Sequence, residues 1–252
     1  MLTEERRQKI KDILENKQRI LVNEVSKEFE ISSVTIRKDL QILEKRGILT
    51  RVHGGAIINH SAVRDLAIAE KEHLHLAEKK RIAFMAESMV SPGDTLILDS
   101  GSTTTQLARL LRFKKDLTII TNAVNIASEL AAGELTVILT GGILREKSFS
   151  LVGPLAEESL KTLTADKLFL GVDGVDFNYG LTTPNILEAR VNKMMIRAAS
   201  QVIILADSSK FGQRSVGVIA NLEEVDKVVT DASISPESLR RLAELGIETV
   251  VV

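Results

Sequence analysis

The sequence predicts an α/β protein in two parts, in which three helices and a β-ribbon precede a larger region that alternates strands with helices. Two observations support this division. Apolar residues recur at helical spacing before Gly47, whereas short and almost continuously apolar runs recur from residue 95 to the end. The chain has 252 residues, 44% of them hydrophobic, and is long enough to bury a core in each part.

Three short amphipathic helices are expected in the N-terminal part. The third begins at Ser32-Ser33, where a hydroxyl can cap free backbone N–H groups, and ends at Gly47. Residues 48–57 then form an extended ribbon that turns at Gly54-Gly55. Three helices and a ribbon are the parts of a winged helix-turn-helix over residues 1–57. The apolar positions are, helix by helix, Ile10, Ile13 and Leu14; Val22, Val25 and Phe29; and Ile36, Leu40 and Leu43.

A polar, irregular stretch over residues 58–77 is interpreted as a linker, followed by a domain over residues 78–252 that opens with a helix. Near-continuous apolar strands are buried on both faces, so we expect a mostly parallel sheet flanked by helices. The expected strands cover residues 95–99, 117–121, 135–140, 167–173, 202–207, 226–231 and 248–252.

One face of the third helix is a candidate DNA-reading surface. If its apolar residues face the core, the polar residues between them turn outward together. Arginine and lysine can donate to guanine edges or phosphates, and hydroxyls near the helix N-terminus can bind phosphate. A solvated charged face is the alternative, although residues 1–57 carry 12 Lys and Arg against 9 Asp and Glu, which favours an anionic partner. The candidate contacts are Ser33, Val34, Thr35, Arg37, Lys38 and Gln41 on the helix, with Arg51 and His53 on the ribbon.

Small and polar residues follow several strands of the larger domain, at the end of an open α/β sheet where ligands bind. Glycine lets a ligand approach the backbone, while hydroxyls and helix N-terminal N–H groups can hold a phosphate. Helix capping favours the same residue types and is the alternative at each loop. The candidates at these strand ends are Asp99, Ser100, Gly101, Ser102, Thr103, Thr104, Thr121, Asn122, Gly141, Gly142, Asp173 and Lys210.

Several classes of site and location are disfavoured by what the sequence lacks. It contains no cysteine and no GxxxxGK[ST], HExxH or GxSxG motif. His73 and His75 form a close pair without a matched third ligand, so neither a metal nor another cofactor is expected. No apolar run is long enough to span a bilayer, and the N-terminus has no apolar core of a secretory signal. We therefore expect a cytoplasmic protein without membrane contact.

Residues 32–56, SSVTIRKDLQILEKRGILTRVHGGA, resemble the N-terminal signature of the DeoR family of bacterial regulators. Segments of the larger domain resemble the same family, including LDSGSTTTQLARLL, LTGGILR, FLGVDGVDFNYGLTTPNILEARVNKMM and ADSSKFG. The resemblance implies a sensor domain with the fold of ribose-5-phosphate isomerase that recognises phosphorylated sugars. Within the family, these segments taken together are most similar to those of regulators of amino-sugar use. DNA contacts implied by it are Ser33, Thr35, Arg37, Lys38, Arg51 and His53, of which His53 has wing packing as an equal alternative.

The resemblance also implies roles within the ligand site. Ser102, Thr103 and Thr104 correspond to the phosphate loop, with Lys210 as a cation beside it. Carboxylates and amides suit sugar hydroxyls because each can bond two neighbouring hydroxyls. An exposed helical charge pair is the alternative for Glu188 and Lys193. The implied hydroxyl contacts are Asp99, Asn122, Asp173, Glu188 and Lys193.

A sugar-phosphate isomerase is the alternative from another functional class. Asp173 and Asp176 resemble the acidic motif of that enzyme, and two carboxyl groups can act as acid and base. The isomerases follow this motif with a lysine in a glycine-rich run, which residues 177–189 lack. We therefore expect a repressor without enzymatic activity, a homo-oligomer on double-stranded operator DNA that a phosphorylated sugar releases.

Overall fold

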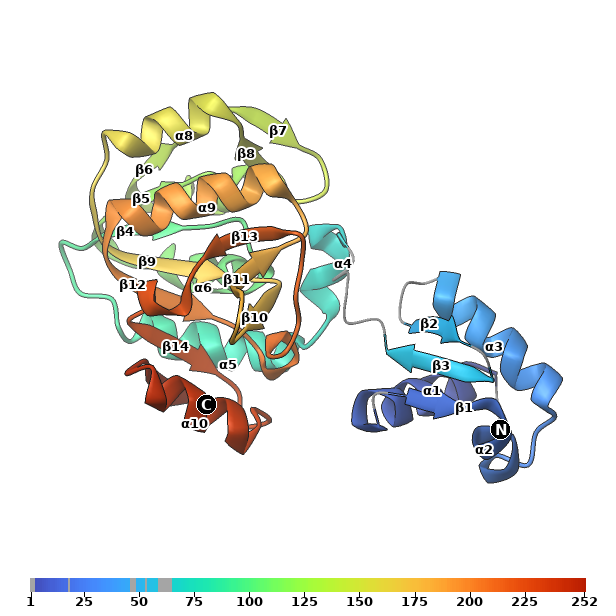
Figure 1. The fold of residues 1–252 in the computed structure, drawn as a ribbon. Helices are drawn as coiled ribbons and strands as arrows, with labels where there is room; N and C mark the ends of the chain where they lie inside the picture. The colour runs from blue at the N-terminus through green and yellow to red at the C-terminus, as the bar shows by residue number, and fades with distance from the viewer. Residues whose placement is uncertain (1–2, 18, 46–48, 53, 59–64) are drawn as a thin grey trace. The chain divides into compact units, whose positions relative to one another are not determined.

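The computed structural model describes residues 3–17, 19–45, 49–52, 54–58 and 65–252. It consists of two compact units, Met1–Arg64 and Asp65–Val252, which we call the N-terminal and C-terminal units (Figure 1). The division falls inside the stretch 58–77 that the sequence pattern assigns to a linker. Residues 65–77 belong to the C-terminal unit.

The N-terminal unit is a winged helix-turn-helix, as predicted. Its three strands form an antiparallel sheet in the order β1-β3-β2. A Cβ at Gly55 would lie 2.1 Å from the carbonyl oxygen of Ile20, so the ribbon can approach β1 only through a glycine. The elements are α1 (Thr3–Lys17), β1 (Arg19–Leu21), α2 (Val22–Glu28), α3 (Ser33–Lys45), β2 (Leu49–Val52) and β3 (Gly55–Ile58).

The core of the N-terminal unit contains the apolar positions predicted for its helices. Ile36 and Leu40 of α3 are fully buried and face Ile10 and Leu14 of α1 within one cluster. Ile13 and Phe29 are partly buried and pack against that cluster. Burial of one face of α3 leaves its opposite face to solvent, which is the condition for reading a groove.

The C-terminal unit contains a seven-stranded parallel sheet in the order β15-β14-β12-β9-β4-β5-β6. All of its strand pairs are parallel. Each strand overlaps a run predicted from the sequence, and the parallel sheet is confirmed; its central strands are buried, whereas the edge strands β6 and β15 are partly exposed. The strands are β4 (Thr95–Leu98), β5 (Lys115–Thr121), β6 (Glu134–Leu139), β9 (Ala165–Gly171), β12 (Ala199–Leu205), β14 (Lys227–Thr230) and β15 (Glu248–Val251).

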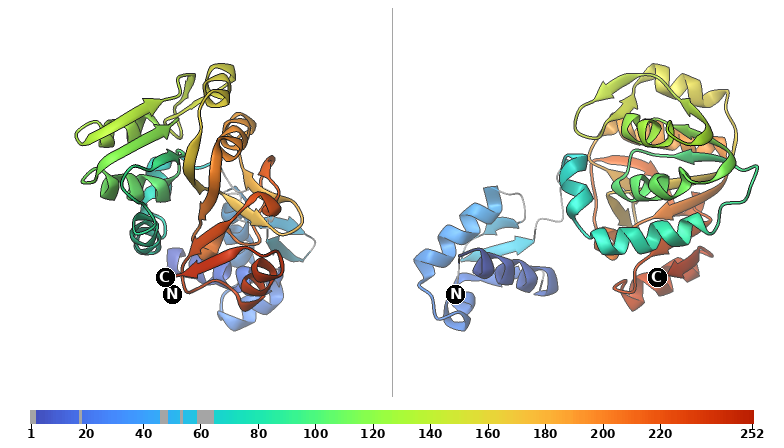
Figure 2. Two further views of the ribbon diagram at one scale, coloured as in Figure 1. Left: turned by 90° about the vertical axis from the view of Figure 1, so that its left-hand side faces the viewer. Right: turned by 180° about the vertical axis from the view of Figure 1, so that it is seen from behind.

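Helices cover both faces of this sheet (Figure 2). Strand β9 shows the arrangement, because Leu168 and Leu170 belong to one apolar cluster while Phe169 belongs to the other. Alternate side chains of a strand point to opposite faces, so every central strand contributes to two cores. One face is covered by α5 (Leu76–Glu87), α6 (Ser102–Leu111) and α7 (Val124–Leu130), and the other by α8 (Pro154–Lys161), α9 (Ile186–Ala198) and α10 (Pro236–Glu244).

Smaller elements that the sequence pattern does not predict complete the C-terminal unit. They are a short helix before α5, an antiparallel hairpin and a small antiparallel sheet ordered β10-β11-β13. No helix within the described residues is long and apolar enough to cross a membrane. The bounds are α4 (Ile68–His73), β7 (Ile143–Arg145), β8 (Ser150–Val152), β10 (Gly174–Asp176), β11 (Gly180–Thr183), β13 (Gly217–Ala220), and the 3-10 turns Ser208–Lys210 and Leu222–Glu224.

Candidate functional site

A polar cleft lies beside the carboxyl ends of β4, β9 and β12, where open α/β sheets bind ligands. The loops that follow these strands supply part of its wall, and α4, α5 and α9 supply much of the rest. The cleft is lined by Leu66, Ile68, Lys71, Lys79, Asp99, Ser100, Gly101, Ser102, Thr103, Ser148, Gly171, Val172, Asp173, Thr183, Glu188, Asn192, Leu205 and Lys210.

The first turn of α6 forms one wall of the cleft. Gly101 is the N-cap residue, and no side chain caps the helix there. Ser102 and Thr103 follow it and line the cleft, so their N–H groups and hydroxyls are available to an anion. Thr104 turns away, because its hydroxyl donates to the carbonyl oxygen of Gly101 at 2.8 Å. This wall has the chemistry of a phosphate site.

Three lysines line the same cleft. Lys79 of α5 is 2% exposed and donates to the carbonyl oxygen of Leu74 at 2.6 Å and to that of Lys71. Burial first, and then the charge of nearby Lys210, lower the pKa of Lys79 to about 8. Because Lys71 and Lys210 also face the cleft, its lining has positive charge to offer an anionic ligand.

The carboxyl groups of the cleft are in three different environments. Asp99, at the end of β4, is almost completely buried, and burial raises its pKa to about 7 although the Gly171 N–H donates to it at 2.9 Å. Asp173 accepts from Lys71 Nζ at 2.5 Å and from the Thr183 hydroxyl at 3.0 Å. Burial therefore favours a protonated Asp99, which could act as a hydrogen-bond donor, while Asp173 is held as an ion pair.

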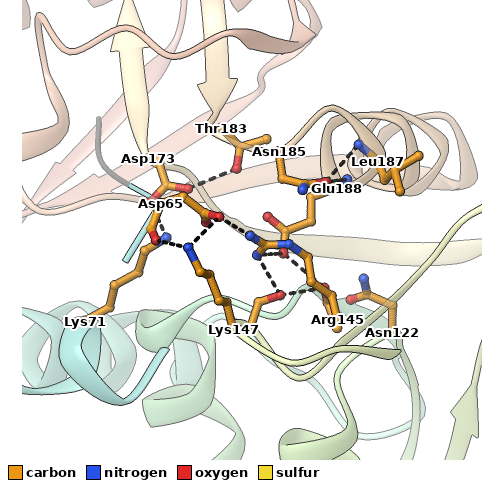
Figure 3. Close-up of polar contacts among 12 residues, drawn as sticks. Asp65, Lys71, Asn122, Arg145, Lys147, Asp173, Thr183, Asn185, Leu187 and Glu188 are labelled. Atoms are coloured by element: carbon orange, nitrogen blue, oxygen red, sulfur yellow. Dashed lines mark hydrogen bonds and ion pairs between the residues drawn. The ribbon is translucent and has the colours of Figure 1, made fainter. Parts of the chain in front are cut away.

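Glu188 of α9 is the third carboxyl group, and it belongs to a polar network (Figure 3). Its Oε1 accepts from Arg145 Nη1 at 3.0 Å and from the Ser150 hydroxyl at 3.0 Å. The other Nη atom of Arg145 binds the carboxylate of Asp65. Glu188 is thus buried and paired, which differs from the exposed helical charge pair considered for it from the sequence.

The structure gathers part of the predicted ligand set in the cleft and places the rest outside its lining. The Thr121 hydroxyl donates to the Leu98 carbonyl at 2.7 Å, and Asn122 donates to the Leu151 carbonyl at 3.2 Å. Lys193 is on the exposed side of α9. The predicted residues that line the cleft are Asp99, Ser100, Gly101, Ser102, Thr103, Asp173, Glu188 and Lys210; those that do not are Thr104, Thr121, Asn122, Gly141, Gly142 and Lys193.

Sequence reasoning missed several cleft residues. Leu66, Ile68 and Lys71 fall in the stretch interpreted as a linker, whose polar and irregular pattern gives no sign of packing. Asn192 could have been found, because it lies four residues after Glu188 and therefore on the same face of α9.

The outward face of α3 carries the predicted DNA-contact residues. Val34 is 70% exposed, and Arg37, Lys38 and Gln41 are exposed as well. Ser33 and Thr35 are half-buried, and the Thr35 N–H donates to the Ser32 hydroxyl at 3.2 Å, so Ser32 caps the helix. His53 lies outside the described residues.

A groove separates α3 from the ribbon within the N-terminal unit, and Arg37 and Arg51 line it. Arg51 is exposed but paired, because its Nε lies 2.7 Å from Glu44 Oε2 and its backbone N–H donates to Glu44 Oε1 at 3.0 Å. The hydrogen bond from the Arg51 backbone, and after it the one from the Arg51 side chain, lower the pKa of Glu44. The groove therefore has two cationic side chains, one of them partly neutralised by a carboxylate.

No group of three or more His, Asp and Glu side chains within the described ranges is arranged to hold a metal ion.

Comparison with known proteins agrees with this division into two units. Residues 6–62 match the DeoR-like helix-turn-helix domain, and residues 74–232 match the DeoR C-terminal sensor domain. The chain is 39% identical over 253 residues to a protein of Escherichia coli O157:H7 named as an aga operon transcriptional repressor, covering 99% of this chain and 94% of that one. It is 38% identical to the HTH-type transcriptional regulator GlpR of Haloferax volcanii, covering 99% of this chain and 98% of that one.

Among solved structures, a D-ribose-5-phosphate isomerase in complex with phospho-erythronic acid is similar with a TM-score of 0.40 and 18% sequence identity. The similarity covers 53% of this chain and 52% of that chain, and it has no bearing on activity. The two matched domains and the full-length relatives are those of regulators and not of enzymes. The chain belongs to the DeoR family of DNA-binding transcriptional regulators.

Proposed function

We propose that this protein represses a sugar or amino-sugar catabolic operon in the cytoplasm and that a phosphorylated sugar releases it from operator DNA. The observation that supports the effector is the composition of the cleft. It has an uncapped helix N-terminus and three lysines, together with three carboxyl groups. A sugar phosphate has the complementary groups, one anionic and the others hydroxyl.

The phosphate would bind at the first turn of α6. The N–H groups and hydroxyls of Ser102 and Thr103 can donate to its oxygens, and the helix dipole favours negative charge there. Lys210 would balance the charge of the phosphate, as the family resemblance implies.

The sugar hydroxyls would bind the carboxyl groups and amides across the cleft. Asp173 and Glu188 each have two acceptor oxygens, and Asn192 on the same helix face as Glu188 can both donate and accept. Asp99, when protonated, could donate to a hydroxyl or a ring oxygen. These residues would set which sugar is recognised.

DNA recognition would use the exposed face of α3 in a major groove, with the ribbon beside it. One winged helix-turn-helix contacts few base pairs, so we propose a homo-oligomer on a two-fold operator, which increases the contact energy. Repression is supported by the similarity to the Escherichia coli relative, which is named as an operon repressor.

The experiment has two readouts on the full chain. A thermal-shift screen would use glucose 6-phosphate, galactosamine 6-phosphate, fructose 1-phosphate, glycerol 3-phosphate and inorganic phosphate. A ligand at 100 times its Kd stabilises by about 2.7 kcal/mol. Fluorescence anisotropy would then measure affinity for the promoter DNA of the operon, with and without each compound. Stabilisation by a sugar phosphate together with weaker DNA binding supports the proposal, and neither effect with any compound contradicts it.

Variants of the first turn of α6 test whether the phosphate binds there. The double change Ser102→Ala and Thr103→Ala should weaken sugar-phosphate binding at least tenfold while leaving operator affinity unchanged. A matched control removes two exposed hydroxyls elsewhere in the unit, Ser88→Ala with Thr162→Ala. Unchanged sugar-phosphate binding in the first variant would reject the phosphate assignment.

A further inference from the structure

Residues 65–74, which we call the strap, directly follow the N-terminal unit in the chain and bind the effector cleft of the C-terminal unit. The strap contains α4, and its Leu66, Ile68 and Lys71 line the cleft. Ile68 is 5% exposed. A segment that connects two units is thus also part of the wall of a ligand site.

The first end of the strap is tied to the Glu188 side of the cleft (Figure 3). The carboxylate of Asp65 binds Arg145, which also donates to Glu188 at 3.0 Å. Lys147 Nζ lies 3.4 Å from the Asp65 carboxylate. The backbone adds a further bond, because the Ile68 N–H donates to the Lys147 carbonyl at 2.7 Å.

The second end is tied to the Asp173 side. Lys71 Nζ lies 2.5 Å from Asp173 Oδ1, and both side chains are partly buried, 22% and 12% exposed. Lys79 of α5 donates to the carbonyls of Lys71 and Leu74 and so binds the C-terminal end of α4. Among the residues that the structure describes, the only ion pair made by Asp173 is therefore the one with Lys71 of the strap.

We infer that the strap is a latch: a sugar phosphate bound in the cleft takes Asp173 from Lys71, and this loosens the segment that leads into the DNA-binding unit. The inference rests on the proposed function, because it requires a ligand in this cleft. Lys71 is a positioning residue for the strap, and Asp173 is the group for which strap and ligand compete.

Charge explains why the exchange can be favourable. The Lys71 ammonium has one carboxylate partner in the free protein, whereas a phosphate at the α6 N-terminus would bring up to two negative charges into the same cleft. Lys71 then has a stronger anionic partner, and the released Asp173 oxygens can accept from sugar hydroxyls. A ligand that binds two states with different affinity shifts their equilibrium, which is the requirement for coupling to DNA.

The test compares Lys71→Gln with Lys210→Gln in the full chain. The probe is the compound of the panel above that most weakens operator binding by the wild type, and its Kd is measured on free and on operator-bound protein. Their ratio is the coupling, typically about 5- to 150-fold. Lys71→Gln should bring this ratio close to one. Lys210 lines the same cleft but belongs to the turn Ser208–Lys210 and not to the strap, so Lys210→Gln should raise both Kd values and keep the ratio. A wild-type ratio in Lys71→Gln overturns the latch.

A second variant changes the strap without touching the cleft lining. Asp65 is absent from that lining, so Asp65→Asn should leave the sugar-phosphate Kd of the free protein within about twofold and still lower the coupling ratio. An unchanged ratio in this variant also counts against the latch. If no compound of the panel binds the wild type, the proposed function fails and the latch fails with it. If a compound binds and releases the protein from operator DNA, but the coupling ratio of both strap variants equals that of the wild type, only the latch is overturned.

Discussion

The carboxyl group of Asp99 accepts a hydrogen bond from the backbone N–H of Gly171 at 2.9 Å, which joins the ends of the neighbouring strands β4 and β9. Burial nevertheless raises the pKa of Asp99 to about 7. The cleft therefore contains a carboxyl group that changes its charge near neutral pH.

The first prediction concerns stability and pH. Between about pH 4 and 7 folded Asp99 holds a proton that the unfolded chain has lost, so stability from this group falls as pH rises through that window. Asp99→Asn should abolish this dependence and make the protein more stable than the wild type at pH 8, by up to about 4 kcal/mol. Urea unfolding followed by circular dichroism at pH 5 and pH 8 measures the free energy of unfolding of both proteins. Asp116→Asn, at an exposed position, should keep the wild-type dependence.

The second prediction concerns the ion pairs that hold α3 against α1. Asp39, 2% exposed, accepts from Arg6 Nε at 2.6 Å and from Arg7 Nε at 2.9 Å. Asp39→Ala removes the carboxylate of the buried ion pair with Arg6, and breaking a buried pair in this way costs about 3 kcal/mol. Asp39→Ala should destabilise the N-terminal unit and abolish operator binding.

Two measurements separate this effect from general misfolding. The sugar-phosphate thermal shift reports on the C-terminal unit and should persist in Asp39→Ala. Glu24→Gln removes an exposed carboxylate of α2 and should behave as the wild type in unfolding. If Asp39→Ala binds operator with wild-type affinity, these pairs do not position the recognition helix.

Elements with a strong local pattern were predictable from the sequence. The central strands of the parallel sheet are buried on both faces, which makes them continuous apolar runs. Helix α3 alternates core positions such as Ile36 with exposed positions such as Arg37. The small sheet β10-β11-β13 was not predicted, since its three- and four-residue strands are too short to show a period.

The residues of the candidate site were predictable from the sequence only where they follow a predicted strand. Asp99 and Ser102 follow β4 directly and were expected together. Lys71 reaches Asp173 across 102 positions of sequence, and no local pattern reports such a contact. Thr121 also follows the predicted pattern of strand ends, but its hydroxyl donates to the Leu98 carbonyl of the neighbouring strand and the residue is not part of the cleft lining.

The third prediction tests the partly neutralised arginine of the DNA groove. Glu44→Gln removes the carboxylate that holds Arg51, so the guanidinium becomes free to bind a phosphate. Operator affinity should rise a few fold, and the slope of log K against log salt should become steeper by about 0.9 for one added phosphate contact. Anisotropy titrations at several salt concentrations measure both. Glu28→Gln removes an exposed carboxylate at the end of α2 and serves as the matched charge control. If the slope of log K against log salt is the same in Glu44→Gln and the wild type, Arg51 does not contact the DNA.

The fourth prediction concerns Arg37, which lines the same groove and is exposed on α3. Arg37→Ala should weaken operator binding by about 1 to 3 kcal/mol, the range for an arginine that contacts a base edge. Its sugar-phosphate thermal shift should stay the same, because that ligand binds in the other unit. Measuring affinity for operator and for unrelated DNA identifies the kind of contact. Weaker binding to operator alone indicates base recognition, and equally weaker binding to both indicates a phosphate contact. Unchanged affinity for both would contradict the assignment of α3 as the DNA-reading helix.

The fifth prediction uses Gly101, whose missing side chain leaves the α6 N-terminus open. Its φ of −72° suits any residue, and an added Cβ would lie 3.0 Å from Thr104 Oγ1 and 3.2 Å from both Asp99 oxygens, so these neighbours would have to move by a few tenths of an ångström. Gly101→Ser should supply a capping hydroxyl that competes with phosphate, and capping by serine in place of glycine changes stability by only a few tenths of a kcal/mol. The variant should keep operator affinity and melting temperature while losing sugar-phosphate binding and release. If the sugar phosphate still releases Gly101→Ser from operator DNA as it does the wild type, the phosphate binds somewhere other than the N-terminus of α6.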